Sequence, residues 1–332
     1  MGEFDLIAAL RARLPEPGPR VLLGVGDDAA ITAPEGVTAT SVDAIVEGVH
    51  FCRDSTPLEA IGRQALAAAL SDLAAMGAAP GEAYIVLGVP EDLDEAGCLE
   101  LLEGAEALAG RTGTALVGGD ISRSAVLFVA MTVVGHAPGA ESLVSRGGAN
   151  AGDVVAVTGE LGGAAAALRL LEGSGASGVP DDLALALRAR QLDPQPRLPE
   201  GRALAASGAT AMIDISDGLG ADAGHIADES GVRLEIDLAT IPLQAGVREV
   251  AMAAGEDTLE LAAGGGEDYE LLCCLPAGSL DRARAAVADV GGSLTVIGRC
   301  VPGEDGGVKL SAPSGRELRV RGFDQLTRHQ QS

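Results

Sequence analysis

The stretch ATAMIDISDGLGADAGHIADES, residues 209–230, decides the fold, because it reads as a buried strand that runs directly into a helix. Residues 209–215 are mostly apolar and predict the strand, and residues 218–230 predict the helix. Outward from this stretch the chain alternates in the same way. Further strands are expected at 21–25, 37–42, 83–89, 114–118, 125–135, 153–158, 232–237, 269–275 and 293–299, and further helices at 58–76, 93–110, 162–173 and 279–290.

This alternation predicts an α+β or α/β fold with two domains, since 332 residues are many for one core. Residues 137–152 form a Gly- and Ala-rich loop that marks the boundary. We therefore expect an N-terminal mixed-sheet domain over residues 1–138 and a C-terminal α/β sandwich domain over residues 139–332.

The predicted strand 209–215 carries a carboxylate near its end. Successive strand residues face opposite sides, so Asp214 and Ser216 share one side while Ile213 and Ile215 face the core. A carboxylate at the end of an apolar strand and before a helix N-terminus suits a metal or phosphate site. Asp217 has two open interpretations, as the N-cap of the helix or as part of that site.

Other acidic residues also lie in short apolar or glycine-punctuated segments and not in charged runs. Burying an unpaired carboxylate is costly, so such residues are usually neutralised by a cation or by many hydrogen bonds. As a set they indicate a site for several metal ions with oxygen ligands. The set comprises Asp28, Asp43, Asp72, Asp120, Asp214 and Asp217.

Each of these segments also has an ordinary structural interpretation. Asp72 lies in an Ala-rich helix, where Asp is unfavourable, but it could simply face solvent. Asp120 follows Gly118 and Gly119, which would let a ligand approach the backbone, but a β-turn would also explain them. Arg146 offers a planar fork for phosphate oxygens, or is an ordinary loop residue.

The segment GGGEDYELL, residues 264–272, is more specific. Three glycines lead into two acidic residues and then into a strand, whereas a simple turn needs only one or two glycines. We interpret this segment as a loop that contacts a ligand.

Composition excludes several classes of protein. The net charge of −25 argues against nucleic acid and anionic membranes as partners. No apolar stretch is long enough to span a membrane, and no signal peptide is recognisable. The chain has one lysine, Lys309, and no Walker A motif. Five cysteines without CxxC spacing indicate a reducing compartment, so we expect a cytoplasmic protein.

Taken together and in order, these segments resemble the thiamine-monophosphate kinases, a family in the superfamily of aminoimidazole ribonucleotide synthetase. The resemblance covers nearly the whole chain. The segments that carry it are residues 2–7, GDDA at 26–29, DAIVEGVHF at 43–51, SDLAAMG at 71–77, GGD at 118–120, SRGG at 145–148, DISDGL at 214–219 and GGEDYEL at 265–271.

The resemblance implies ATP-dependent phosphorylation of thiamine monophosphate to thiamine diphosphate, with several Mg²⁺ ions and ATP as co-substrate. It also implies a homodimer in which the N-terminal domains pair their sheets. The implied metal ligands are Asp28, Ser41, Val42, Asp43, Asp72, Asp120, Asp214 and Asp217. The residues that would meet ATP are Gly119, Asp120, Arg146 and Ser216, and those on the thiamine side are His50, Glu267 and Phe323. The implied catalytic set is Asp72, Asp120, Asp214 and Arg146.

Two positions depart from the pattern of this family. In this family two hydroxyl residues usually precede the Asp that corresponds to Asp43. Here those two positions hold Ser41 and Val42, and Val42 can offer a metal only its backbone carbonyl oxygen. The family often carries a C-terminal Trp against the substrate, and Phe323 is the candidate here. Two alternatives stay open, an enzyme like aminoimidazole ribonucleotide synthetase and a non-catalytic relative that binds nucleotide or metal.

Overall fold

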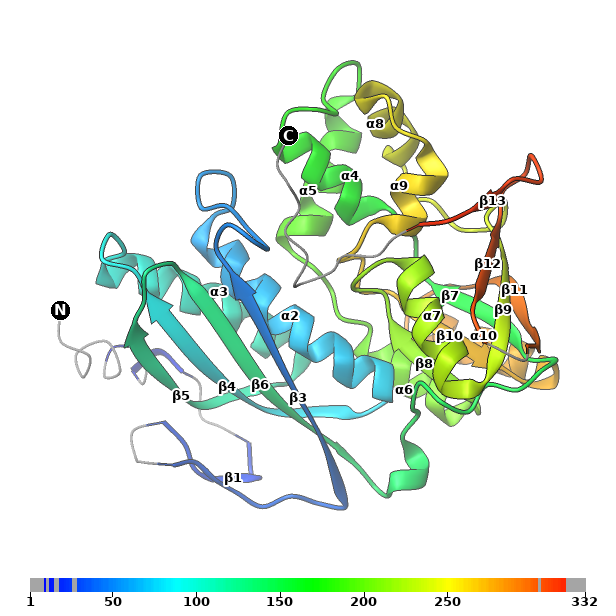
Figure 1. Cartoon of the computed structure of the whole chain (residues 1–332). Helices are drawn as coiled ribbons and strands as arrows, with labels where there is room; N and C mark the ends of the chain where they lie inside the picture. The colour runs from blue at the N-terminus through cyan, green and yellow to red at the C-terminus, as the bar shows by residue number, and fades with distance from the viewer. Residues whose placement is uncertain (1–8, 10–11, 15–17, 26–28, 304–305, 321–332) are drawn as a thin grey trace. The chain divides into compact units, whose positions relative to one another are not determined.

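A computed structural model of the chain describes residues 9, 12–14, 18–25, 29–303 and 306–320 (Figure 1). The chain forms two compact units. The first comprises Met1–Leu143 and Leu192–Leu198, and the second comprises Val144–Gln191 and Pro199–Ser332. The boundary between residues 138 and 139 that the sequence indicates stays a prediction.

The first unit is built on a mixed four-stranded sheet with two helices on one face (Figure 1). β4 and β5 are parallel, and the other neighbouring strands are antiparallel. The strand order is β3 (Val37–Val46), β6 (Phe128–Ala137), β4 (Ala79–Val89) and β5 (Ala115–Arg123), and the helices are α2 (Leu58–Met76) and α3 (Glu95–Thr112). β1 (Val21–Leu23) and β2 (Ile31–Thr32) form a separate antiparallel pair.

The two helices of this unit pack closely because small residues line their contact. A Cβ atom on Gly62 of α2 would lie 1.9 Å from the carbonyl oxygen of Leu101, and one on Gly104 of α3 would lie 1.9 Å from that of Glu59. Most alanines of α2 are fully buried. An Ala- and Gly-rich sequence therefore compensates for the scarcity of aromatic residues by close backbone approach.

The second unit is built on a seven-stranded sheet in which one pair, β12 with β9, is parallel. The strand order is β13 (Glu317–Leu318), β12 (Val308–Ser311), β9 (Val232–Asp237), β11 (Leu294–Pro302), β7 (Val154–Thr158), β10 (Leu271–Leu275) and β8 (Ala211–Asp214). The helices are α4 (Gly163–Leu171), α5 (Asp181–Leu192), α6 (Leu198–Ala206), α7 (Leu219–Ser230), α8 (Val247–Ala254), α9 (Thr258–Gly264) and α10 (Leu280–Asp289).

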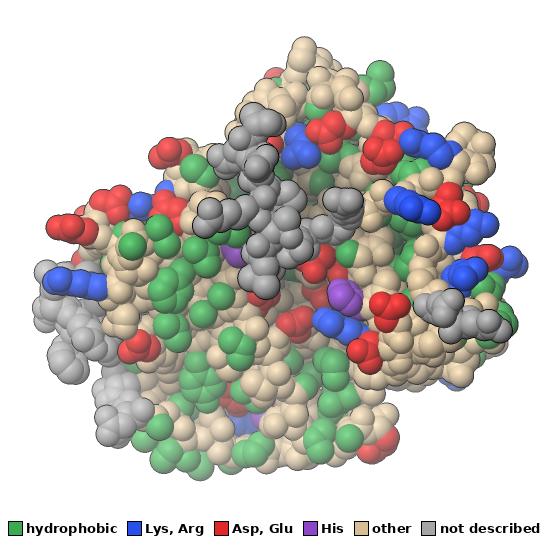
Figure 2. Space-filling model, viewed as in Figure 1, with side chains coloured by type: hydrophobic (Ala, Val, Ile, Leu, Met, Phe, Trp, Pro, Cys, Tyr) green, Lys and Arg blue, Asp and Glu red, His purple; other side chains and the backbone are tan. Residues whose placement is uncertain are grey.

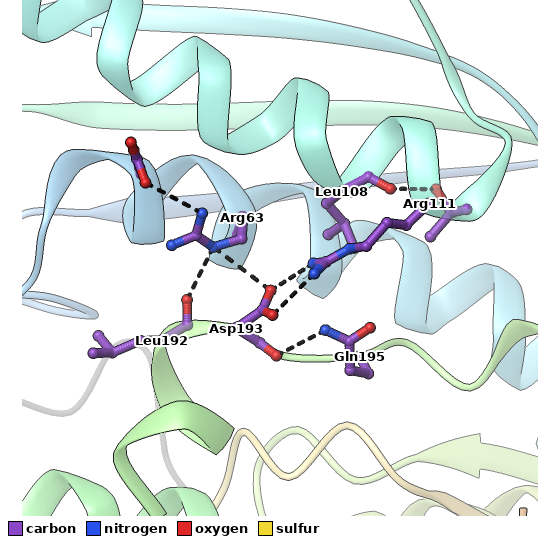
Figure 3. Close-up of polar contacts among 8 residues, drawn as sticks. Arg63, Leu108, Arg111, Leu192, Asp193 and Gln195 are labelled. Atoms are coloured by element: carbon purple, nitrogen blue, oxygen red, sulfur yellow. Dashed lines mark hydrogen bonds and ion pairs between the residues drawn. The ribbon is translucent and has the colours of Figure 1, made fainter. Parts of the chain in front are cut away.

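Segment Leu192–Leu198 joins α5 to α6 but belongs to the first unit (Figure 3). Asp193 accepts hydrogen bonds from both terminal nitrogens of Arg111 on α3, at 2.9 and 2.5 Å. Arg63 on α2 donates to the carbonyl oxygen of Leu192 at 3.3 Å and lies 3.6 Å from the Asp193 carboxylate. The sequence did not indicate this return of the chain to the first unit.

The predicted α+β class with mixed sheets is confirmed. Helix α2 and strand β9 have the predicted bounds, whereas β6 begins at Phe128 and not at residue 125. The sequence missed β2, β12 and β13, which are two to four residues long. Among the residues described, no helix has the length and apolar character needed to cross a bilayer.

Candidate functional site

In the first unit, three of the predicted oxygen donors gather on the face of the sheet that α2 covers. Ser41 and Asp43 are two residues apart on β3 and therefore share a face. The Ser41 hydroxyl donates a hydrogen bond to Oδ2 of Asp72, on α2. Asp72 is half-buried, so it is not the solvated surface residue of the alternative interpretation. Ser41, Asp43 and Asp72 thus form one group of hard oxygen donors.

Asp120 lies on the opposite face of that sheet. It pairs in register with Val86 of β4, whereas the neighbouring Ile85 and Leu87 are buried on the helix side. Its carboxylate accepts a hydrogen bond from Ser122 at 2.9 Å and is exposed. β5 is also three strand spacings from β3, about 14 Å. Within one chain the structure therefore does not bring Asp120 to the Ser41–Asp72 pair.

The glycine before Asp120 has a structural cause that the sequence interpretation missed. A Cβ atom on Gly119 would lie 1.9 Å from the carbonyl oxygen of Ile85 on the neighbouring strand. Close approach of β4 is therefore sufficient to require glycine here, with or without a ligand.

Among the other site residues predicted in the first unit, the structure describes His50 and Val42. The backbone N–H of Val46 donates to Nδ1 of His50 at 3.1 Å, so the proton of a neutral His50 ring lies on Nε2. The Val42 side chain is 68% exposed and points to the face opposite Ser41. Asp28, and Phe323 of the second unit, lie outside the described residues.

In the second unit, Asp214 ends the edge strand β8 and is 3% exposed. The chain then turns into α7, whose N-cap is Gly218, without a side-chain cap from Asp217. The interpretation of Asp217 as the helix N-cap is therefore wrong. Instead, Oδ2 of Asp222 accepts the backbone N–H groups of Ser216, Asp217 and Gly218, at 3.1, 3.1 and 3.0 Å.

Asp222 is a residue of the site that sequence reasoning missed. It is 2% exposed, and burial together with the charges of Asp214 and Asp217 raises its pKa to about 8, although its backbone hydrogen bonds oppose this. One potential ligand atom each from Asp217, Asp222 and His225 lies within 4.8 Å of the others. The available signal was an acidic residue in the first turn of α7 at the spacing of the buried Leu219 and Ile226.

The loop 264–269 runs beside the end of β8. The N–H of Glu267 donates to the carbonyl oxygen of Ser216, and the N–H of Tyr269 donates to that of Ile215, both at 2.9 Å. Glu267 and Tyr269 have φ values of 64° and 48°, a left-handed conformation that costs free energy in residues other than glycine. The structure thus brings Glu267 to the backbone that carries Ser216 and Asp217.

Two of the three acidic residues of segment 264–272 bind other groups of the protein. Asp268 accepts the N–H groups of Gly162 and Ala164, at 2.7 and 3.2 Å, at the start of α4. Glu270 is fully buried and accepts hydrogen bonds from Thr158 at 2.7 Å and Arg190 at 2.5 Å. Only Glu267 is half-buried at the loop surface, where Gln191 donates to it at 2.5 Å. Of these three acidic residues, only Glu267 is therefore still a candidate for contact with a ligand.

The backbone of Arg146 does not lie near the acidic residues Asp217 and Asp222. Its carbonyl oxygen accepts a hydrogen bond from Ser230, at the C-terminal end of α7, at 3.2 Å. Asp217 and Asp222 lie at the other end of this 12-residue helix, which is about 18 Å long. The Arg146 side chain is exposed.

The donors in both units fit a hard divalent cation. They are carboxylate and hydroxyl oxygens, which Mg²⁺ prefers over nitrogen and sulfur. Burial, together with the charges of Asp214 and Asp217, raises the pKa of Asp222, and a bound cation would relieve this accumulation of negative charge.

With fold and site described, the chain can be placed among known proteins. It belongs to the family of AIR synthase related proteins, because the N-terminal domain model of that family matches residues 26–137 and the C-terminal domain model matches residues 150–311. Within it, the chain belongs with the thiamine-monophosphate kinases. It is 39% identical over 284 residues to the thiamine-monophosphate kinase of Mycobacterium tuberculosis, covering 84% of this chain and 83% of that protein.

Solved structures agree with this placement. The thiamine-monophosphate kinase of Stenotrophomonas maltophilia superposes with a TM-score of 0.81 at 36% identity, over 93% of this chain and 96% of that one. AaThiL in complex with AMPPCP and TMP superposes with a TM-score of 0.77 at 31% identity, over 98% of this chain and 97% of that one.

Proposed function

We propose that this protein transfers the γ-phosphoryl group of ATP to thiamine monophosphate, giving thiamine diphosphate, by direct in-line transfer assisted by several Mg²⁺ ions. The observation that carries the proposal is the acidic group Asp214, Asp217 and Asp222 beside Glu267, on a chain whose relatives are thiamine-monophosphate kinases. The relative solved with AMPPCP and TMP supports both substrates.

The acceptor explains why acidic residues dominate the site. A phosphate monoester already carries about −1.5 to −2 charges at neutral pH, so its oxygen needs no general base to attack. The obstacle is repulsion between two polyanions. Bound Mg²⁺ would neutralise both phosphates and stabilise the equatorial oxygens of the transferring group.

We assign roles to the chain's own residues accordingly. Ser41, Asp43 and Asp72 would hold metal in the first unit, with Ser41 orienting the Asp72 carboxylate. Asp217, which lies with Asp222 and His225, and Asp214, whose charge acts on Asp222, would hold metal in the second unit. The remaining proposed metal ligands are Asp28, Asp120 and the backbone carbonyl oxygen of Val42. ATP would be contacted by Gly119, Ser216 and Arg146. The thiamine side of the acceptor would be contacted by His50, Glu267 and Phe323.

We further propose a homodimer that pairs the open faces of the first sheets. Val42 and Val86, on the face away from α2 and α3, are 68% and 36% exposed. Hydrophobic side chains spread over this part of the first unit in Figure 2. An exposed apolar sheet face of this kind is typical of an interface. Asp120 lies on the same face.

The five cysteines are all free thiols, four of them buried, which supports the proposed cytoplasmic location.

The test is ADP production from Mg-ATP with thiamine monophosphate added or withheld. We expect ADP and thiamine diphosphate to form only when both substrates and Mg²⁺ are present, and excess EDTA to abolish turnover. ADP formation that depends instead on the acceptor of aminoimidazole ribonucleotide synthetase would favour an enzyme of that type. Nucleotide binding without turnover on either acceptor would favour the non-catalytic alternative.

A further inference from the structure

Three consecutive backbone N–H groups converge on one oxygen of Asp222. They belong to Ser216, Asp217 and Gly218, and all three bonds are 3.0–3.1 Å long. N–H groups converging before a helix are the arrangement with which many proteins bind a phosphate. Here the protein's own carboxylate occupies it. These N–H groups therefore bind Asp222 and are not available to bind a phosphate. The sequence-based interpretation of this helix N-terminus as a phosphate site is thus not supported.

The loop from Ser216 to Gly218 is held from two sides. On one side Asp222 projects from α7, next to Leu219 and Ala223, which are fully buried and fix the helix. On the other side the backbone N–H of Glu267 donates to the carbonyl oxygen of Ser216, and a Cβ atom on Gly218 would lie 2.9 Å from the backbone of Gly264. The directions in which Asp217 and Ser216 present their side chains depend on these contacts.

This arrangement has an electrostatic cost that an ordinary cap does not have. Asp257 caps α9 with two similar bonds, to Leu259 and Glu260 at 2.9 and 3.2 Å, and its side chain is 41% exposed. Asp222 makes its bonds while buried beside two other carboxylates. A capping role alone would be met by an exposed residue such as Asp257, so the buried placement indicates a further role.

We propose that Asp222 is a positioning residue, which holds the Ser216–Gly218 loop so that Asp217 faces the metal and Ser216 faces the nucleotide. This inference rests on the proposed function, since it assigns Asp217 and Ser216 those partners. Asp222 is assigned no contact with substrate.

The test uses the full chain with Asp222→Asn and Asp222→Ala, and Asp257→Ala as the matched capping control. Binding of Mn²⁺ alone is measured from the electron paramagnetic resonance signal of the free ion. Amide hydrogen exchange of residues 216–218 is measured on the metal-free protein. We expect the Kd for Mn²⁺ to rise about tenfold in Asp222→Ala and about threefold in Asp222→Asn, whose amide oxygen still accepts hydrogen bonds from the loop. Exchange at residues 216–218 should quicken in the same order, and the control should change neither quantity.

An unchanged Kd for Mn²⁺ would overturn the inference, and so would a raised Kd with unchanged exchange, because Asp222 would then act as a ligand or as a charge only. If Asp222→Ala does not fold, Asp222→Asn decides by the same two criteria. Failure of the proposed function is a separate result, since wild-type protein that binds Mn²⁺ but does not phosphorylate thiamine monophosphate would leave the loop measurements interpretable.

Discussion

Asp193 binds Arg111 through both carboxylate oxygens, at 2.5 and 2.9 Å, although 82 residues separate them in the chain. Asp193 also lies 3.6 Å from Arg63 (Figure 3). A bidentate pair with a second arginine is stronger than a single exposed ion pair, but both partners are partly exposed and screened by solvent.

We therefore expect Asp193→Ala to lower the free energy of unfolding by about 1 kcal/mol, measured by urea denaturation. The matched control is Arg299→Ala, which removes an ion pair with Glu235 whose arginine is 70% exposed. This control should change stability by less than about 0.5 kcal/mol. Equal effects of the two substitutions would show that the Asp193 contacts do not tie the segment Leu192–Leu198 to the helices.

Asp72→Asn should reduce turnover at least about 100-fold while the protein still folds. The amide retains an acceptor for the Ser41 hydroxyl, but it loses the charge that would bind Mg²⁺. Turnover is measured by ADP release, and folding by the thermal transition in circular dichroism. Glu100→Gln, on the exposed side of α3, removes one charge elsewhere in the same unit and should leave turnover unchanged. Turnover of Asp72→Asn within threefold of wild type would refute the assignment.

Asp268 predicts a pH dependence of stability. Burial raises its pKa to about 6, above about 3.9 in an unfolded chain, despite Arg190 and two backbone N–H bonds. Between these values the native state binds more protons than the unfolded state. This group therefore lowers stability as pH rises from about 4 to about 6, by up to roughly 3 kcal/mol, and has no further effect above.

The measurement is the urea midpoint from pH 4.5 to 7.5. Asp268→Asn should lack this part of the slope, whereas Asp257→Asn, at the exposed cap of α9, should retain the wild-type slope. Identical slopes for Asp268→Asn and wild type would contradict the prediction.

The cysteines should differ sharply in reactivity. Cys52 is exposed, whereas Cys98, Cys273, Cys274 and Cys300 are buried, and burial raises the pKa of Cys273 to about 12. A thiol must ionise and be accessible to react. We expect Ellman's reagent to modify one thiol in the native protein and five after unfolding, and Cys52→Ser to remove the native reaction. Rapid modification of two or more native thiols would contradict the described burial.

The proposed dimer is tested at the centre of the open sheet face. Val86→Glu should convert a dimer, at twice the chain mass of 33.1 kDa, into a monomer, because it places a charge in an apolar contact. Mass is measured by light scattering after size-exclusion chromatography. Met252→Glu, at a side chain 73% exposed on α8, is the control and should stay dimeric. A monomeric wild type, or a dimeric Val86→Glu, would reject this interface.

Local signals in the sequence located most elements correctly. The Ala-rich run before Gly77 was sufficient for the bounds of α2, because a left-handed glycine with φ of 70° ends the helix. The short strand β12 could not be found, because it pairs with β9, more than 70 residues away, and β13 in turn pairs only with β12. The same division holds for the site: Ser41 and Asp43 could be assigned to one face by alternation, but their contact with Asp72 could not.

The sequence by itself determined the class of elements, the acidic character of the site and the family, because periodicity, glycine positions and ordered motifs are local properties. Only the tertiary structure decided which carboxylates meet. It assigned Asp268 to the start of α4, Glu270 to Arg190 and Asp72 to Ser41. A carboxylate's partners are set by long-range packing, and neighbouring residues in the chain do not encode that packing.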